Sequence, residues 1–466
     1  MAPLAFDAVV SIVLAFFLLF LYGAALDSTY DVPLLSTFLF INGLLSLIGI
    51  IISLRFGSTL FMITFYFNII FLSAAPLQQI ANTWSNIYLD SELTLSAIGL
   101  YIISTIIGLI TLLIRCSLAN RLSDDRWSAS LIPMIEAGGG SGLGRLLIIL
   151  LPISIVLIAL YSPMLFSSRE AFGRHVGTIF SRELSIIVTS VLHPFIFISA
   201  TIGLVLSARS GRLALSLGFL IAFMIAVLIY NPFIQARFRL SAMIVFLALV
   251  IYGWQSTRAL FTFLISGTAI SPILNSFRTL ESTTDARTLT DFFSHMDYDA
   301  FTMTCYVIKY VLNEGVDYGV SAASAFLFFV PRALWPGKSD HVAKIMFDFL
   351  VAAFEAGTDN LSTPPVAEGF FAFGAIGSIL ATVLYFWMIL SIERRALAAQ
   401  PFSPAVLMAS VAPMLVFILL RGPLIVGISE LSGALVALVL CMWIIGAFSS
   451  MPQRRVLSSR PKFRSP

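Results

Sequence analysis

The chain has 466 residues, of which 59% are hydrophobic and 11% are charged. Soluble domains are about half apolar and about a quarter charged, so this composition excludes a soluble protein and predicts an all-α, polytopic membrane protein. A net charge of +3 gives no reason to expect a nucleic-acid partner, and the three cysteines lack the spacing of metal ligands.

Apolar stretches recur along the chain at lengths that suit a membrane. A transmembrane helix needs about 20 mostly apolar residues. Twelve such stretches are predicted, and in chain order they are 5–25, 33–54, 57–75, 93–114, 146–162, 184–206, 213–230, 240–256, 259–275, 367–391, 403–420 and 424–446. The ninth is the weakest, because the sequence TAISPIL within it is polar and contains a helix breaker. The first has no positively charged segment before it, so we expect a retained span and not a cleaved signal peptide.

The positive charges of the short loops predict the orientation of the chain, because Lys and Arg concentrate in cytoplasmic loops. If the N-terminus is cytoplasmic, the loops on that side carry arginines such as Arg55, Arg115 and Arg258. The outer loops 26–32 and 76–92 carry no Lys or Arg. We therefore expect a multi-pass protein with both termini in the cytoplasm.

The later outer segments carry many cations, against this bias. The chain has 23 Arg and 4 Lys. Those predicted to lie outside are Arg169, Arg174, Arg182, Arg237, Arg239, Arg278, Arg287, Lys309, Arg332, Lys338, Lys344 and Arg421. An anionic ligand on the outer side would account for them, and arginine suits phosphate because its planar guanidinium donates two parallel hydrogen bonds.

Residues 276–366 form an outer segment that is too long for a simple connector. Its three apolar stretches, 300–312, 319–330 and 342–354, are too short to span a membrane, so re-entrant or interfacial helices are expected there. The third is predicted to turn a charged face, which includes His341, toward a cavity. The predicted organisation is therefore nine spans in 1–275, the outer segment 276–366, three spans in 367–447 and a basic cytoplasmic tail in 448–466.

The sequence PRALWPGK at 331–338 is the most specific local signal. Pro336 and Gly337 predict a turn, and Arg332 and Lys338 would project from this short loop beside Trp335. We interpret the loop as a cationic clamp on a phosphate, with Trp335 at the membrane interface or under a sugar ring. The alternative is that the cations reach lipid headgroups within an ordinary aromatic belt.

Other outer arginines are weaker candidates for the same role. Arg169 and Arg174 could bind an anion or lie in a solvated loop. Of Arg237 and Arg239, one is expected to reach headgroups and the other to turn inward. Arg421 follows an apolar run with no acid beside it, which predicts that it lines a polar cavity.

Several outer groups could accept a proton, and Glu368 at the start of the tenth span is the first of them. Its alternative role is a helix N-terminal charge favoured by the dipole. Asp297 and Asp299 could act as bases or cap the helix that follows, and His341 is a further candidate. The chain contains no acidic metal-binding motif, so neither a metal nor another cofactor is expected.

The sequences DYDAF, PRALWPGK, AEGFFAFGAIGS and LLRGP resemble the Wzy-type polymerases, which join oligosaccharide repeat units into O-antigen and related bacterial surface polysaccharides. The resemblance covers residues 297–378 and 421–423. It implies a GT-C-like glycosyltransferase of the inner membrane with its active site on the periplasmic side. The enzyme would transfer the growing glycan from undecaprenyl diphosphate onto another lipid-linked repeat unit, among membrane lipids and with a chain-length regulator and a flippase as further partners.

Carried over by motif, Arg332, Lys338 and Arg421 would hold the diphosphate and Glu368 would be a candidate base. An O-antigen ligase shares this donor and many spans, and nothing in the sequence determines the acceptor. A flippase for lipid-linked oligosaccharide is the alternative from another class; it should show related halves with charges near mid-membrane. Here the halves differ and the charges gather on one side, which favours surface chemistry.

Overall fold

A computed structural model describes residues 2–27, 32–82, 91–119, 142–167, 169–231, 234–235, 237–252, 257–278, 293, 298–330, 332–354, 361–398 and 404–446. These residues are 86% helical and contain no strand. The predicted basic tail lies outside the described residues. The all-helical fold is what a membrane imposes, because a helix satisfies its own backbone hydrogen bonds.

The helices of the first half of the chain are α1 (Ala2–Leu26), α2 (Pro33–Phe56), α3 (Thr59–Ile69), α4 (Ala75–Ala81), α5 (Ser91–Ala119), α7 (Leu143–Tyr161), α8 (Arg169–Ile179), α9 (Arg182–Ile187), α10 (His193–Arg209) and α11 (Leu213–Ile229). Those of the second half are α12 (Arg237–Tyr252), α13 (Thr257–Arg278), α14 (Ala300–Glu314), α15 (Val320–Phe326), α16 (Val342–Phe354), α17 (Pro365–Ala398), α18 (Pro404–Arg421) and α19 (Leu424–Ile445). Two π-helical turns, η1 (Ile70–Ala74) and η4 (Val188–Leu192), join α3 to α4 and α9 to α10.

Each stretch that the sequence predicts as a span is mainly helical in its described residues, although 253–256 and 403 lie outside the description and Phe373 and Gly374 interrupt the tenth stretch. Among the described residues, eight helical segments are long and apolar enough to cross a membrane. The prediction of a helical membrane protein is therefore confirmed, whereas the number of twelve spans stays a prediction. The three short apolar stretches of the outer segment also coincide with helices, namely α14, α15 and α16.

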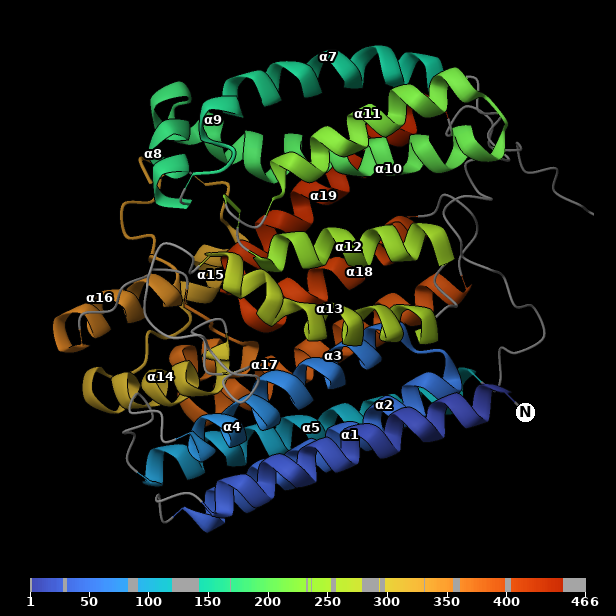
Figure 1. Cartoon of the computed structure of the whole chain (residues 1–466). Coiled ribbons are helices and arrows are strands. Elements are labelled where there is room, and N and C mark those ends of the chain that lie inside the picture. The colour runs from blue at the N-terminus through green and yellow to red at the C-terminus, as the bar shows by residue number, and fades with distance from the viewer. Residues whose placement is uncertain are drawn as a thin grey trace, which may run out of the picture.

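The buried apolar side chains form two large clusters. One cluster joins α1 to α5 with α13, α14 and α17, and the other joins α7, α8, α10 and α11 with α19. The helices α12 and α18 contribute side chains to both clusters. Figure 1 shows them between the two groups, with α14, α15, α16 and α8 gathered at the end of the bundle opposite the N-terminus.

Arg115 does not lie in a loop, as the charge-based prediction of topology assumed. The positive-inside pattern treated it as a loop cation, but it is buried within α5, and its Nε donates to Glu393 of α17 at 3.0 Å. The carboxylate also accepts from Ser58 Oγ at 2.6 Å and from the backbone N–H of Leu60 at 2.8 Å. This buried ion pair therefore fastens the turn between α2 and α3 to two further helices.

The helix α17 is broken near its start. Phe373 and Gly374 are not helical, and Gly374 has a φ of +65°, which favours glycine. A Cβ added at Gly369 would lie 2.4 Å from the carbonyl oxygen of Gly377. Residues eight positions apart in a continuous helix are separated by about 12 Å along the axis, so the short first part, 365–372, must fold back against the rest. This hairpin carries Glu368.

Candidate functional site

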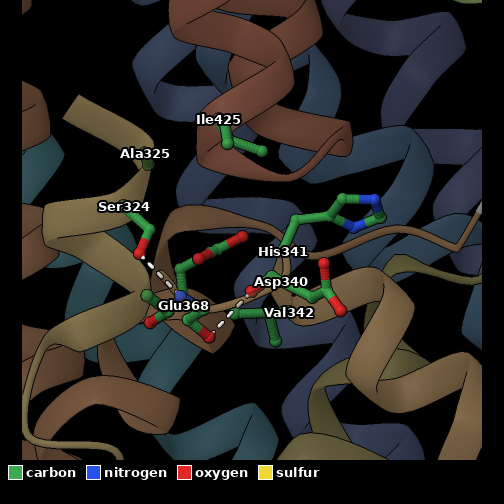
Figure 2. A pocket seen from close by; sticks show the side chains of 9 residues that line it. Ser324, Ala325, Asp340, His341, Val342, Glu368 and Ile425 are labelled. Carbon is green, nitrogen blue, oxygen red and sulfur yellow. Dashed lines mark hydrogen bonds between the residues drawn. The ribbon is translucent and has the colours of Figure 1, made fainter. Parts of the chain in front are cut away.

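A narrow pocket forms where the outer segment covers the start of α17. Its lining combines polar and small apolar side chains, namely Ser321, Ser324, Ala325, Ser339, Asp340, His341, Val342, Glu368 and Ile425. They come from α15, from the turn before α16, from the short first part of α17 and from the start of α19 (Figure 2). Two groups predicted as proton acceptors, Glu368 and His341, thus share one pocket although 26 residues lie between them in the sequence.

Glu368 is buried, and its carboxylate is held on one side only. Its Oε1 accepts hydrogen bonds from Thr363 Oγ1 and from the backbone N–H of Leu424, each at 3.1 Å. Leu424 is the first residue of α19, so the carboxylate lies at the positive end of a helix dipole. Within the described part of the chain no donor reaches Oε2.

His341 has its ring orientation fixed by its own helix. The backbone N–H of Lys344 donates to both the carbonyl oxygen of His341 at 2.9 Å and its ring Nδ1 at 3.0 Å. A neutral imidazole whose Nδ1 accepts must carry its proton on Nε2. The geometry therefore favours His341 as a hydrogen-bond donor and leaves Glu368 as the better acceptor of a proton.

Lys338 uses its ammonium group to close the loop that contains it. Its Nζ donates to the carbonyl oxygens of Leu327, Phe328 and Val330 at 3.1, 2.8 and 3.0 Å. An ammonium group has three donors, so all of them are engaged within the protein. Desolvation, followed by the nearby charge of Arg332, lowers the pKa of Lys338. The predicted contact with a diphosphate would require at least one of these bonds to break.

Arg332 is the half-exposed cation of the same loop. Its Nη1 donates to the carbonyl of Lys338 at 3.0 Å, and its Nη2 forms an ion pair with Asp340. Asp340 also lines the pocket and lies 3.6 Å from Lys344 Nζ, so one carboxylate is shared by two cations. Lys344 also lies 3.8 Å from Asp348, so three cations, Lys338 included, face two carboxylates, and one positive charge is in excess beside the pocket. Trp335, the predicted sugar contact, is partly exposed on this loop.

The side chain of Asp299 does not cap α14, which was one of the two roles predicted for it. It occupies the N-cap position of α14 but makes no capping hydrogen bond with its side chain. Its carboxylate instead accepts from the backbone N–H of Ser362 at 3.1 Å and from the Ser362 hydroxyl. This contact holds the segment that leads into Thr363 and Glu368, so Asp299 supports the pocket from outside. Asp297 lies outside the described residues.

The remaining predicted cations are distributed over several helices. Arg421 is buried at the end of α18, and its carbonyl accepts from the backbone N–H of Thr363 at 3.0 Å. Arg174 is exposed on α8, at the same end of the bundle as α14 to α16 (Figure 1). Arg169 and Arg237 are the first residues of α8 and α12, and their side chains lie outside the description.

Sequence reasoning missed several polar partners. Ser321 and Ser324 on α15 and Ser339 on the turn face the pocket, and the helical spacing of the first two was a usable signal. Of Arg237 and Arg239, one was expected to turn inward, and Arg239 does so: its Nη2 lies 2.6 Å from Glu430 of α19. No signal local to the sequence pointed to that acidic partner.

Comparison of the chain with protein-family models, with curated proteins and with solved structures gave no match. The resemblance to Wzy-type polymerases thus rests on the four sequence segments alone.

Proposed function

We propose that the protein is an inner-membrane glycosyltransferase that polymerises undecaprenyl-diphosphate-linked repeat units on the periplasmic face of the membrane. The observation that carries the proposal is the shared pocket of Glu368 and His341 beside the cationic Arg332 loop, at one end of a membrane helix bundle. In the proposed topology the chain crosses the membrane twelve times and keeps both termini in the cytoplasm.

In the proposed reaction, a hydroxyl oxygen of the acceptor sugar attacks the anomeric carbon of the donor glycan. The bond between that carbon and the diphosphate oxygen breaks, and undecaprenyl diphosphate leaves with the electron pair. Glu368 takes the proton of the attacking hydroxyl through Oε2, the oxygen that accepts no hydrogen bond from the described residues. Atoms and charge balance without a metal or redox partner.

The leaving diphosphate gains negative charge as the bond breaks, and pre-placed cations stabilise that charge. Arg332 is suited to this because half of its side chain is exposed and its acidic partner is shared. Each charge-assisted hydrogen bond contributes about 1.5–3 kcal/mol. Arg421 stays a proposed second ligand, whereas Lys338 is better assigned to holding the loop in shape.

The serine side chains of the pocket suit a carbohydrate acceptor. The Ser321 hydroxyl is buried without a hydrogen-bond partner among the described residues. Buried polar groups are normally paired, so an unpaired hydroxyl in a pocket is a natural site for a ligand hydroxyl. We assign Ser321 and Ser324 to the binding of sugar hydroxyls next to Glu368.

The test uses the purified protein with a synthetic lipid-linked repeat unit, with products separated on a gel. A ladder of lengthened glycans is expected from the wild type and from Glu314→Gln, a matched acid-to-amide change at the exposed last residue of α14. Glu368→Gln and Arg332→Ala should both lose the ladder while remaining folded. Transfer to lipid A-core without a ladder would indicate the ligase, and movement of intact lipid between leaflets would indicate the flippase.

A further inference from the structure

The short helix α15 has its polar face buried and its apolar face exposed. Ser321 and Ser324 are buried against the pocket, whereas Phe326 is 63% exposed. A helix that faces water shows the reverse arrangement, with apolar side chains toward the core and polar ones outward. The inversion is stable where the outer medium is hydrocarbon, which solvates phenylalanine and does not solvate a hydroxyl.

The exposed apolar surface extends beyond α15 in both directions. In the loop that follows, Phe329 and Leu334 are also exposed, Leu334 to 78%. On the other side, Gly319 packs closely on the ring of Phe373, which is an exposed residue of the candidate span α17. These exposed apolar side chains lie in one stretch of the chain, which adjoins an exposed residue of a candidate membrane helix, so hydrocarbon is the medium that suits them.

A cation lies within this apolar segment. The Arg332 side chain is 50% exposed, and Asp340, its acidic partner, is shared with Lys344, which also pairs with Asp348. With Lys338, three cations face these two carboxylates, so one positive charge is in excess. An apolar surface with a neighbouring excess cation is complementary to an anionic lipid, which joins a hydrocarbon chain to a phosphate. Arg332 also connects through Asp340 to the pocket that contains Glu368.

We propose that the outer face of α15 and the loop residues 327–330 and 332–334 dock the hydrocarbon chain of an anionic lipid whose phosphate binds Arg332. The inference deepens the proposed function and rests on it only for identifying that lipid as the polyprenyl diphosphate substrate. In this arrangement the substrate reaches the pocket sideways from the bilayer and not from the water above it. The buried hydroxyl face of α15 then lies between the lipid chain and Glu368.

Site-directed fluorescence tests the docking surface directly. The three native cysteines, Cys116, Cys305 and Cys441, are buried, so a single introduced cysteine can be labelled. Phe326→Cys is labelled with bimane in liposomes, and Asp348→Cys serves as the water-facing control because its native side chain is 62% exposed on α16. Nitroxide-labelled phospholipid should quench the label at 326 several-fold more than aqueous iodide does, with the opposite order at 348. Stronger quenching by iodide at both positions would overturn the proposal.

The role of the lipid headgroup is tested with nitroxide-labelled phospholipids that have the same acyl chains and differ only in the headgroup. Phosphatidylglycerol should quench the label at 326 at least twice as strongly as phosphatidylcholine, and Arg332→Gln should remove the difference. Equal quenching by the two lipids in the wild-type background would overturn the assignment of Arg332. Displacement of the nitroxide lipid by undecaprenyl diphosphate would identify the polyprenyl lipid as the occupant; retained phosphatidylglycerol preference would identify an ordinary anionic phospholipid.

These measurements separate the inference from the proposed function, because quenching requires no glycan transfer. Lipid docking with no polymerisation of a competent substrate would refute the proposed function alone. Polymerisation with a water-exposed label at 326 would refute the docking surface alone.

Discussion

Replacement of Glu393 by glutamine should destabilise the protein through a buried arginine. Glu393 is fully buried, and its Oε2 accepts from both Arg115 Nε and Ser58 Oγ, while its Oε1 accepts from the backbone of Leu60. In glutamine an NH2 group replaces one of the two oxygens, and this donor then faces the N–H or O–H donors from which that oxygen accepted. Glu393→Gln therefore leaves the Arg115 guanidinium without its anion and at least one further donor without an acceptor.

The expected loss follows from the burial of the pair. Breaking a buried ion pair by removing one partner costs about 3–5 kcal/mol. Unfolding entropy is about 2.1 cal/mol/K per residue, or about 1 kcal/mol/K for this chain of 466 residues. Glu393→Gln should accordingly lower the Tm by about 3–5 °C.

A thiol-reactive fluorophore can follow this unfolding in detergent, because the native cysteines are buried in the folded protein and Cys116 is the direct neighbour of Arg115. Glu314→Gln removes an exposed charge at the end of α14 and should leave the Tm unchanged. The double variant Arg115→Gln with Glu393→Gln should lose less than the sum of the two single losses, since no buried charge then stays unpaired. An unchanged Tm in Glu393→Gln, or strictly additive losses, would refute the reasoning.

Three further predictions concern the pocket and its supports. Gly369→Ala should separate the two parts of α17, because its Cβ would clash with the carbonyl oxygen of Gly377. Glycan transfer by this variant should fall at least tenfold. The control Gly99→Ala has open space around the new Cβ and should keep full activity. Lys338→Met should increase limited proteolysis of the loop 327–341 through loss of three hydrogen bonds, and unchanged proteolysis would contradict this structural role. Glycan transfer should proceed fully in EDTA, and a strict need for a divalent ion would exclude the proposed metal-independent reaction.

Much of the candidate site could be predicted as a set of residues but not as an arrangement. The charge pattern and the apolar run lengths selected Glu368, His341 and Arg332, and the fold brings these three to one place. The same reasoning gave Lys338 an outward role, although its ammonium group faces the backbone of its own loop. Charge alone does not distinguish a lysine that binds a ligand from one that satisfies carbonyl groups left at the end of a short helix.

The sequence by itself determined that this is a helical membrane protein and where its long apolar helices lie, because burial in hydrocarbon depends on the length and composition of each local stretch. It did not predict α8, which forms in a segment expected to be a loop. Only the tertiary structure decided which polar groups meet. Arg115 and Glu393 are 278 residues apart, and Arg239 finds Glu430 on another helix. The break in α17 that places Glu368 likewise depends on the close approach of Gly369 and Gly377. Such contacts are selected by the packing of whole helices against one another, and no local pattern encodes that packing.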